Sequence, residues 1–394
     1  MMKKKIEPNN NLTNRKIKII DLFSGVGGLT FGFYYSIYRN SFVKNDNFEI
    51  LFANDYDQQA SSAFTTNYPD IKMFNNSIED ITLDFLKKHE INYADTDLII
   101  GGPPCQSYSF IGKRENDTRS KMYSEYKRML TIIKPKMFIF ENVLGILSFK
   151  LPDNSKIINH IIDEFNEIGY SVSMQVLNSL DYGVPQNRLR VFIVGIRSDT
   201  KIEWKFPLPV KERKLTLLDA ISDLPQIGQN QSGDNYICEP LTSYQSLMRK
   251  KSKSISEHYC GVYGDRITSI IYNLGPGEAH DDINKKVDQG ILPKDLYLTS
   301  GYHNSYGRLL WDKPSGTITN NFSTPSAIRC IHPDQNRALT IREAARIQSF
   351  PDWFEFFGSK TSKKTQVGNA VPPLLAICLA KQIEIAFRGN LNGE

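Results

Sequence analysis

The sequence is poor in cysteine and lacks the close cysteine pairs that a zinc site needs. No two of its five cysteines form a CxxC pair; they are Cys105, Cys238, Cys260, Cys330 and Cys378. An odd number of widely spaced cysteines argues against a structural metal and a disulfide framework, and it favours a reducing compartment. We therefore expect no bound metal and a cytoplasmic protein.

A long hydrophobic run is also missing. None approaches the roughly 18 residues of a membrane-spanning helix, and the basic start Met1–Lys5 has no apolar stretch behind it, as a secretory signal would. With 40% hydrophobic and 23% charged residues among 394, the composition is typical of a soluble protein with one large and one smaller domain. We expect no contact with a membrane.

Most of the chain lacks an excess of either charge. The formal net charge is +5, but residues 1–20 carry six Lys or Arg against one Glu, which leaves 42 of each sign in the rest. Composition therefore does not identify a nucleic-acid-binding protein, and any attraction to DNA must come from local patches.

What the sequence does contain is an alternation of short apolar segments and longer amphipathic ones. Strands are predicted at Ile17–Phe23, Glu49–Ala53, Leu98–Ile100, Met137–Phe140 and Arg190–Val194, with helices between them such as Gln58–Asn67, Tyr123–Ile133 and Lys156–Ile168. This alternation predicts an α/β fold with a mostly parallel, doubly wound sheet. Residues 201–310 have weak periodicity, and further helices are predicted at Thr340–Phe350 and Leu374–Phe387.

A glycine-rich turn follows the first predicted strand, in Asp21–Leu29 (DLFSGVGGL). Such a turn lets a ligand approach the backbone closely. Because Gly27 and Gly28 are adjacent, the segment is not the GxGxxG dinucleotide fingerprint, and a plain tight turn is an equally good interpretation.

An acid, Asp55, ends the second predicted strand. A carboxylate at this place can accept hydrogen bonds from ribose hydroxyls, and Tyr56 could stack on an adenine face. The alternative is that Asp55 caps the helix Gln58–Asn67.

The segment Asp97–Ser109 (DLIIGGPPCQSYS) runs from an apolar strand through Gly-Gly-Pro-Pro to Cys105. The glycines leave room for a ligand, and the prolines stiffen the turn. A lone cysteine is most often a small core residue, but the polar loop that follows disfavours burial. We interpret Cys105 as a presented nucleophile.

Two further polar groups follow predicted strands. Glu141 comes after Phe138–Phe140, at a strand end where open α/β sheets gather ligands; a solvated loop glutamate is the alternative. Arg188 and Arg190 share one face of an incipient strand because strand side chains alternate. This pair indicates an anion or a base edge as partner, and a surface salt bridge is the alternative.

In this order and at these spacings, the segments resemble the motifs of the cytosine-C5 DNA methyltransferases, in particular bacterial type II modification enzymes. FSGVGGL resembles the cofactor loop, GGPPCQSYS the nucleophile loop, ENV (141–143) the cytosine-binding motif and QNRLR (186–190) the arginine motif. RLLWDKPSGTI (308–318), LTIREAARIQSFP (339–351) and QVGNAVPP (366–373) resemble later motifs.

The resemblance implies a Rossmann-like fold. It also implies that the protein transfers a methyl group from S-adenosylmethionine (SAM) to carbon 5 of a flipped-out cytosine, leaving S-adenosylhomocysteine (SAH). Cys105 would add to cytosine C6, Glu141 would hydrogen-bond N3 and the exocyclic amine, and Arg190 would hold O2. The other implied catalytic residues are Gln106, Asn142 and Arg188. The implied cofactor residues are Phe23, Ser24, Gly25, Val26, Gly27, Gly28, Leu29, Asp55, Tyr56, Ser77, Ile78, Pro103, Asn369 and Ala370.

One departure from the family pattern concerns the adenine site. Where the family usually has an Asp–Ile step facing the adenine amino group, this chain has Ser77-Ile78. A serine can accept a hydrogen bond but carries no charge, which puts the adenine contact at this point in doubt.

The resemblance also implies a division of the chain and its contacts with DNA. Residues 1–16 would be a loose basic arm, 17–199 the catalytic domain, 200–340 a small, irregular, mostly β target-recognition domain, and 341–394 a return to the catalytic domain. Residues 110–122 would close over DNA, and a basic run after residue 247 would anchor phosphates, with a solvated loop as the alternative. The implied DNA contacts are Ser109, Lys113, Arg114, Arg249, Lys250, Lys251 and Lys253.

The expected partner is double-stranded DNA, and the expected setting is a prokaryotic or phage protein at the nucleoid. We expect a monomer that shares a restriction-modification system with an endonuclease without a stable complex, although an orphan enzyme would look the same. One rival is an RNA methyltransferase on the same scaffold, but the tRNA-methylating branch usually has PPCQPFT where this chain has PPCQSYS. A non-catalytic relative would be expected to lose Cys105 or Glu141.

Overall fold

The central sheet of the larger lobe has seven strands, in the order β5-β4-β1-β6-β7-β9-β8. The computed structural model describes residues 15–104 and 122–389. The strands are β1 (Ile17–Leu22), β4 (Phe48–Asn54), β5 (Met73–Phe74), β6 (Leu98–Gly101), β7 (Met137–Val143), β8 (Tyr170–Asn178) and β9 (Leu189–Arg197). The first five strands of the sheet are parallel, and β9 runs antiparallel to both β7 and β8. The predicted mostly parallel, doubly wound sheet is thus confirmed.

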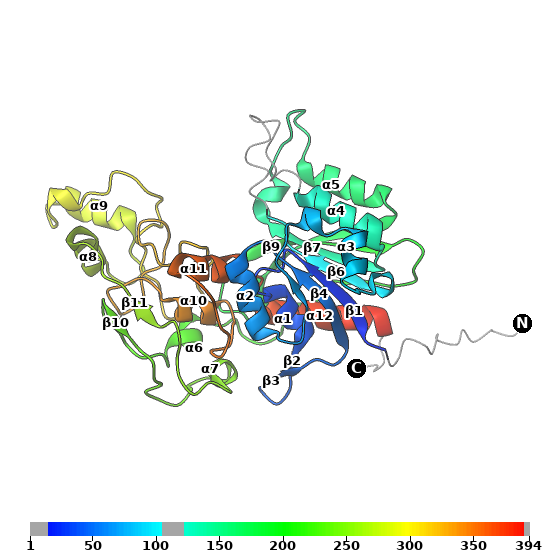
Figure 1. Cartoon of the computed structure of the whole chain (residues 1–394). Coiled ribbons are helices and arrows are strands. Elements are labelled where there is room, and N and C mark those ends of the chain that lie inside the picture. Colours follow the sequence, from blue (N-terminus) through cyan, green and yellow to red (C-terminus); the bar gives the residue numbers. More distant parts are fainter. Residues whose placement is uncertain (1–14, 105–121, 390–394) are drawn as a thin grey trace, which may run out of the picture.

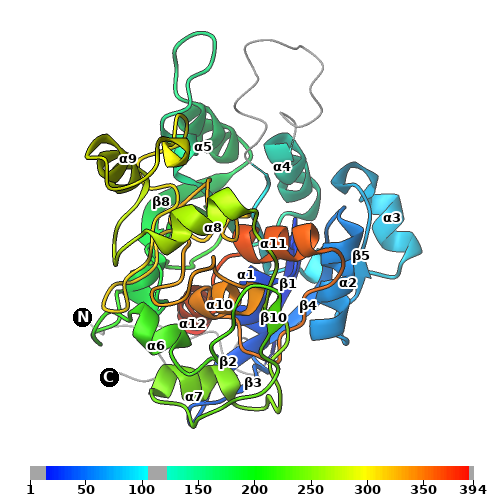
Figure 2. The ribbon, with the colours of Figure 1, turned by 90° about the vertical axis from the view of Figure 1, so that its left-hand side faces the viewer.

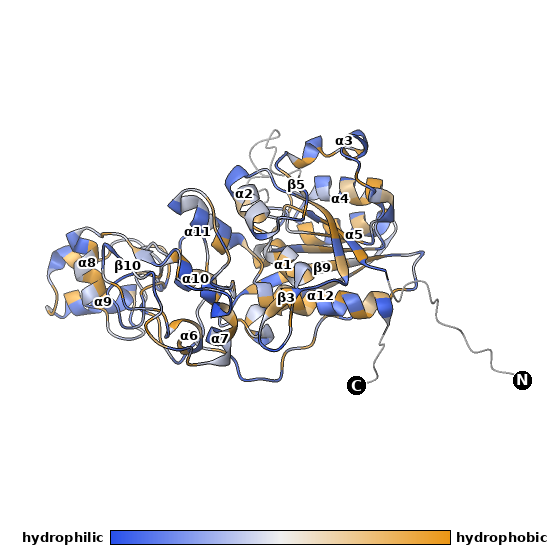
Figure 3. Ribbon diagram, turned by 60° about the horizontal axis from the view of Figure 1, so that its bottom comes forward, coloured by the Kyte–Doolittle hydropathy of each residue, from blue (hydrophilic) through white to orange (hydrophobic). Residues whose placement is uncertain are grey.

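Helices cover both faces of this sheet (Figure 1). One face packs against α3 (Leu83–Lys88), α4 (Met122–Ile133) and α5 (Ile157–Glu167), and the other against α1 (Gly28–Tyr34) and α12 (Pro373–Arg388). Because strand side chains alternate, Ile20 of β1 faces the first layer and Ile19 the second. Figure 3 shows the resulting apolar strands between helices with hydrophilic outer positions.

In this layer α12 packs against α1, although the two helices lie at opposite ends of the sequence. A Cβ on Gly32 would lie 2.1 Å from the backbone carbon of Ala376, so the two helices cross at backbone contact. The larger lobe also contains α2 (Gln58–Asn67), the hairpin of β2 (Tyr35–Ile37) and β3 (Phe42–Lys44), and short 3-10 helices.

The smaller lobe is irregular, as predicted, but the expectation that it is mostly β is wrong for the described residues. Its strands β10 (Gln231–Ser232) and β11 (Tyr259–Cys260) have two residues each. The regular structure of this lobe is mostly helical instead, and packing of its short helices buries their apolar side chains. The helices are α6 (Leu217–Ile221), α7 (Ser243–Arg249), α8 (Asp265–Tyr272), α9 (His280–Asp288), α10 (Ile341–Ile347) and α11 (Lys360–Asn369).

The chain returns to the larger lobe at α12. Helix α10 stays in the smaller lobe, where Ile341 and Ala344 share a core with Leu217 and Ala220 of α6. The domain limits remain predictions. Because α10 packs in the smaller lobe, we would propose that the chain returns to the larger lobe at about residue 372 and not at residue 341. Within the described residues, no single helix is long and apolar enough to cross a membrane; α11 and α12 meet that criterion only together, as a pair bent by 40°.

Candidate active site

A cavity of about 370 Å³ lies at the carboxyl ends of β1, β4, β6 and β7, the edge at which such sheets bind ligands. Helix α11 of the smaller lobe contributes to its wall, and Figures 1 and 2 both place α11 next to α2. Most of the predicted site residues line this cavity. They are Phe23, Ser24, Gly25, Val26, Gly28, Leu29, Asp55, Tyr56, Pro103, Glu141, Asn142, Arg190, Asn369 and Ala370.

The glycine turn after β1 needs glycine for two different reasons. Gly25 and Gly27 have φ angles of 54° and 82°, which a residue with a side chain adopts at a cost. The turn closes through the Gly27 N–H, which donates to the Ser24 carbonyl at 2.8 Å. A Cβ on Gly28 would lie 2.5 Å from the Val371 carbonyl oxygen, so this position must be bare for the C-terminal segment to approach.

Asp55 supports this turn and does not cap α2. Its Oδ2 accepts a hydrogen bond from the Gly25 N–H at 2.8 Å, and its Oδ1 accepts one from the Asp57 N–H at 2.9 Å. The cap is Asp57, which accepts two backbone N–H groups of the first turn, so the capping alternative for Asp55 is wrong. Burial raises the pKa of Asp55. The neighbouring Tyr56 is 74% exposed and lines the cavity, which leaves an aromatic face available.

Glu141 lies inside β7 and is buried, so the solvated-loop alternative is wrong. The Nε of Arg190, also largely buried, lies 3.1 Å from Glu141 Oε1. Burial raises the pKa of Glu141, against the opposing charges of Arg190 and Arg188. Among the described residues, Oε1 has no hydrogen-bond partner. Glu141 is therefore a buried carboxyl group with a raised pKa, and its Oε1 meets Arg190 as an ion pair without a hydrogen bond.

The loop that leads to Cys105 is held next to Glu141. Asn142 donates from Nδ2 to the Pro103 carbonyl at 3.1 Å. A Cβ on Gly102 would lie 2.8 Å from Glu141 Oε2, so glycine at this position lets the acid lie against the loop. Cys105 and Gln106 lie outside the described residues, and their roles stay predictions.

This combination of glycine turn, strand-end acids and a buried Glu–Arg pair fits the motifs from which the family was inferred. Residues 17–385 match the model of the C-5 cytosine-specific DNA methylase family. The chain belongs to this family.

Two of its relatives are type II methyltransferases from bacteria. The chain is 35% identical to the type II methyltransferase M.DdeI of Desulfomicrobium norvegicum, over 95% of this chain and 90% of that protein. It is 32% identical to the type II methyltransferase M.NgoFVII of Neisseria gonorrhoeae, over 99% and 92%. The protein is therefore a DNA cytosine-5-methyltransferase.

Solved structures of methyltransferases share its fold. A DNA modification methyltransferase encoded within an E. coli prophage superposes with a TM-score of 0.73 at 24% identity, over 94% of this chain and 99% of that one. Entamoeba histolytica methyltransferase EhMeth does so with a TM-score of 0.56 at 18% identity, over 94% and 98%. These likenesses confirm the Rossmann-like fold.

Some predicted cofactor residues of this cytosine methylase do not line the cavity. Gly27 faces the core, where a Cβ would lie 2.4 Å from the Tyr68 ring. Ser77 is exposed and Ile78 is buried at the start of a short 3-10 helix, and neither is in the cavity wall. A contact between Ser77 and the cofactor stays a prediction without support from this geometry.

Arg188 is fully buried and bonded to backbone. It donates from Nη1 to the Ile318 carbonyl at 2.7 Å and from Nη2 to the Gly368 carbonyl at 2.9 Å. In the methylase Arg188 therefore ties the start of β9 to α11, and we interpret it as a positioning residue.

Sequence reasoning identified Asn369 at the end of α11 but missed the other residues of this helix that line the cavity. Ser362 and Thr365 line the cavity together with Asn369, and these positions share one helical face. Their spacing from the QVGNAVPP motif could have identified them, because it places them one and two turns before Asn369. Asp21 also lines the cavity; it stands at the start of the glycine segment, but its residue type alone gives no reason to expect a ligand.

The basic run of the methylase is largely occupied by contacts within the protein. Arg249 Nη1 lies 3.3 Å from Asp223 Oδ2, and Lys251 donates to the Phe42 carbonyl at 2.7 Å. Both views show α7 beside β3 (Figures 1 and 2). Lys250 also donates to the Arg39 carbonyl, at 3.4 Å. We therefore assign the run a packing role, and a phosphate contact of the exposed Lys253 stays a prediction. Three predicted DNA contacts lie outside the described residues: Ser109, Lys113 and Arg114.

Proposed function

We propose that this methylase transfers a methyl group from SAM to carbon 5 of a flipped-out cytosine within a specific double-stranded DNA sequence. A covalent bond from Cys105 to cytosine C6 would carry the reaction. The observation that supports this most is that the glycine turn and Asp55 line the same cavity as Glu141 and Arg190.

The residues of the cavity fit SAM. Asp55 offers carboxylate oxygens near a nucleoside ribose, and the exposed ring of Tyr56 can cover an adenine. A side chain at Gly28 would close the approach between the turn and the C-terminal segment. When bound there, SAM supplies an electrophilic methyl group.

The chemistry requires a nucleophile because carbon 5 of cytosine is itself a poor one. Addition of the Cys105 thiolate to C6 forms a carbon–sulfur bond and turns the ring into an enamine. Carbon 5 would then take the methyl group that bound SAM supplies, with SAH as the leaving group. Loss of the C5 proton to solvent and elimination of the thiolate would restore the aromatic ring and free the cysteine.

Glu141 and Arg190 would hold the cytosine during this addition. A neutral carboxyl can donate a hydrogen bond to N3 as the ring gains electron density, and burial favours that neutral form. Arg190 would bind O2 with an N–H group other than Nε, which pairs with Glu141. The reacting carbon is stacked inside a duplex, so the base must leave the helix first.

The similarity to type II methyltransferases supports a restriction-modification setting, in which methylation protects host DNA from a cognate endonuclease. Bisulfite sequencing of DNA from a host that expresses the methylase tests the substrate. Protected cytosines should occur in one sequence context, and conversion of every cytosine would contradict the proposal.

The covalent step can be tested with duplex DNA containing 5-fluorocytosine, which blocks the final elimination. Wild-type protein with SAM should form a complex that survives denaturing electrophoresis, and Cys105→Ala should form none. Cys238→Ala is a matched control, because Cys238 is exposed in the smaller lobe and should trap DNA like wild type. A trapped complex with Cys105→Ala would show that another residue is the nucleophile.

A further inference from the structure

Helix α11, which ends at Asn369 in the cavity wall, depends on distant residues for its last hydrogen bonds. The final carbonyl groups of a helix have no partner within the helix. Val367 and Gly368 near the end of α11 are buried, so their carbonyls need partners inside the protein. The chain after α11 soon reaches Pro372 and Pro373, which have no N–H group to donate. The donors must therefore come from other segments.

Two buried side chains supply these donors. Gln348 directly follows α10, which lies beside α11 (Figures 1 and 2). It donates from Nε2 to the Val367 carbonyl at 2.7 Å and to the Ala370 carbonyl at 3.4 Å. Arg188 holds the carbonyl of the residue after Val367. The end of α11 is thus fixed by a smaller-lobe amide and a larger-lobe guanidinium.

Gln348 is itself held by Gln186, and we call these two glutamines the amide relay. The Ile318 N–H donates to Oε1 of Gln186 at 2.9 Å, and Nε2 of Gln186 donates to Oε1 of Gln348 at 2.8 Å. Nε2 of Gln348 then donates to Val367. The N–H group that begins this chain of bonds can only donate, and the carbonyl that ends it can only accept. The orientation of both amides is therefore determined, and each position needs a donor and an acceptor together.

The amide relay does more than fill space. Both glutamines are fully buried, which is rare for this residue type, and an apolar side chain of similar length would occupy the same volume. Gln348 instead bonds the carbonyls of Val367 and Ala370, which lie on either side of Asn369 in the sequence. Neither Gln186 nor Gln348 is part of the cavity wall, whereas Asn369 and Ala370 are.

We propose that Gln348, held by Gln186, is a positioning residue that places Asn369 and Ala370 for contact with the cofactor. This inference rests on SAM as the ligand of the cavity, and it extends the proposed function to two residues that do not touch the ligand. Loss of the amide relay should weaken cofactor binding. It should leave the chemical step intact, because Glu141 lies on a strand that the relay does not contact.

Gln348→Met tests the positioning role, because methionine has a similar length but no N–H group to donate. By isothermal titration calorimetry, its dissociation constant for SAH should rise on the order of tenfold, as loss of a supporting hydrogen bond does at other binding sites. The KM for SAM should rise in the same proportion, and kcat at saturating SAM should stay near that of wild type. Folded Gln348→Met that binds SAH as tightly as wild type would show a purely structural role and overturn the proposal.

Gln186→Met tests whether the two glutamines act as one unit. It should weaken SAH binding as well, and the double variant should bind about as weakly as either single variant, because residues in one network are not additive. An unaffected Gln186→Met variant, or a double variant whose loss is the product of the two single losses, would overturn the amide relay.

Ile161→Ala is the control for a general loss of stability. Ile161 is fully buried in α5, in the helical layer away from α1 and α12. The variant should have a lower melting temperature and the SAH affinity of wild type; an equal loss of affinity here would contradict the positioning role. If circular dichroism shows that Gln348→Met does not fold, Gln348→Asn replaces it with the same expected loss, because its side chain is one methylene shorter.

Wild-type protein separates this inference from the proposed function. If wild type binds SAH and all relay variants bind it equally well, only the positioning role fails. If wild type binds neither SAH nor SAM, the proposed function itself fails.

Discussion

At the residue scale, the distance between Gly102 and Glu141 decides how close the acid lies to the loop that leads to Cys105. Gly102 directly follows β6, and Glu141 lies in β7, the adjacent parallel strand; an added Cβ on Gly102 would meet Glu141 Oε2 at 2.8 Å. The end of the glutamate side chain can move away from such a contact. A substitution here should therefore displace the carboxyl group without unfolding the protein.

We expect Gly102→Ala to lower kcat on the order of 10- to 100-fold, because small misplacements of reacting groups have effects of this size. The melting temperature should change little. Gly145→Ala is the control, since its Cβ would meet only Val143 Cγ2, at 3.8 Å. Methyl transfer to DNA at saturating SAM measures both, and a Gly102→Ala rate equal to wild type would contradict the role assigned to this contact.

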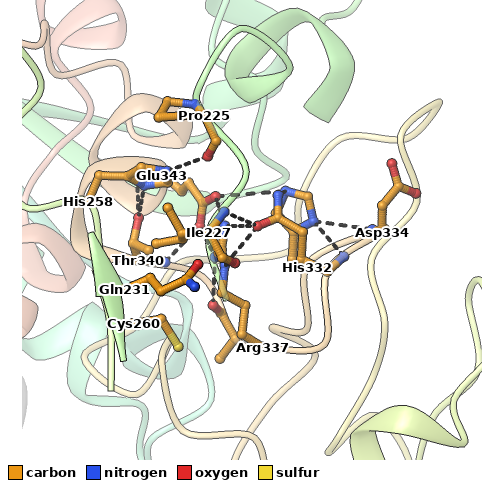
Figure 4. Close-up of polar contacts among 12 residues, drawn as sticks. Pro225, Ile227, Gln231, His258, Cys260, His332, Asp334, Arg337, Thr340 and Glu343 are labelled. Atoms are coloured by element: carbon orange, nitrogen blue, oxygen red, sulfur yellow. Dashed lines mark hydrogen bonds and ion pairs between the residues drawn. The ribbon is translucent and has the colours of Figure 1, made fainter. Parts of the chain in front are cut away.

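At the element scale, the segment before and within α10 joins the smaller lobe through a buried polar network (Figure 4). Arg337 pairs with Glu343 through two hydrogen bonds of 2.7 and 2.8 Å. His332 accepts the backbone N–H groups of Asp334 and Gln335 on its Nδ1, at 3.2 and 3.1 Å. An imidazole that accepts on Nδ1 must be unprotonated there.

This network predicts an acid-sensitive lobe. Burial lowers the pKa of His332 from 6.5 to about 4, so between these values the unfolded chain binds a proton that the folded chain does not. The free energy of unfolding should therefore fall as pH drops below 6.5, by about 1.4 kcal/mol for each unit of pKa difference once pH is below 4.

His332→Asn provides the comparison, because its Oδ1 can accept the same N–H groups and does not titrate. Denaturant midpoints of wild type and variant should converge as pH falls from 7 to 5. A constant difference across this range would show that His332 does not contribute to the pH dependence.

At the scale of the whole molecule, the cavity joins two lobes through α11. A Cβ on Gly358 would lie 2.0 Å from Oε1 of Gln59 in α2, and Asn67 exchanges hydrogen bonds of 2.8 and 3.0 Å with the backbone of Glu355. Lys363 of α11 pairs with Glu257 at 2.6 Å. The wall that carries Ser362 and Thr365 is therefore fixed to both lobes.

Ligand binding should consequently protect both lobes. With saturating SAH, amide hydrogen exchange should slow in residues 23–29 and also in α11, because bound ligand suppresses local opening of the segments it contacts. The β10–β11 pair has no residue in the cavity wall and should exchange at an unchanged rate. Protection confined to the larger lobe would contradict a shared site.

The success of sequence reasoning differed between the lobes for physical reasons. Central parallel strands such as β6 and β7 are buried on both faces, so each is a continuous apolar run that is visible in the sequence. The edge strand β8 is mostly exposed and carries Ser171, Ser173 and Gln175, so it gives no such signal. In the smaller lobe, short helices and loops depend on partners that lie far away along the chain.

The sequence by itself determined the central strands of the sheet, the family, and the positions of Asp55 just after β4 and of Glu141 in the last part of β7, because a strand and the residues at its end are adjacent in the chain. Only the tertiary structure decided that Arg188 and Arg249 point inward and that Ser362 and Thr365 of α11 line the cavity. These outcomes depend on contacts between segments many residues apart, such as the 180 residues that separate Arg188 from Gly368. No local pattern encodes such a contact, because the residues next to each partner in the sequence do not show which distant segment it will meet.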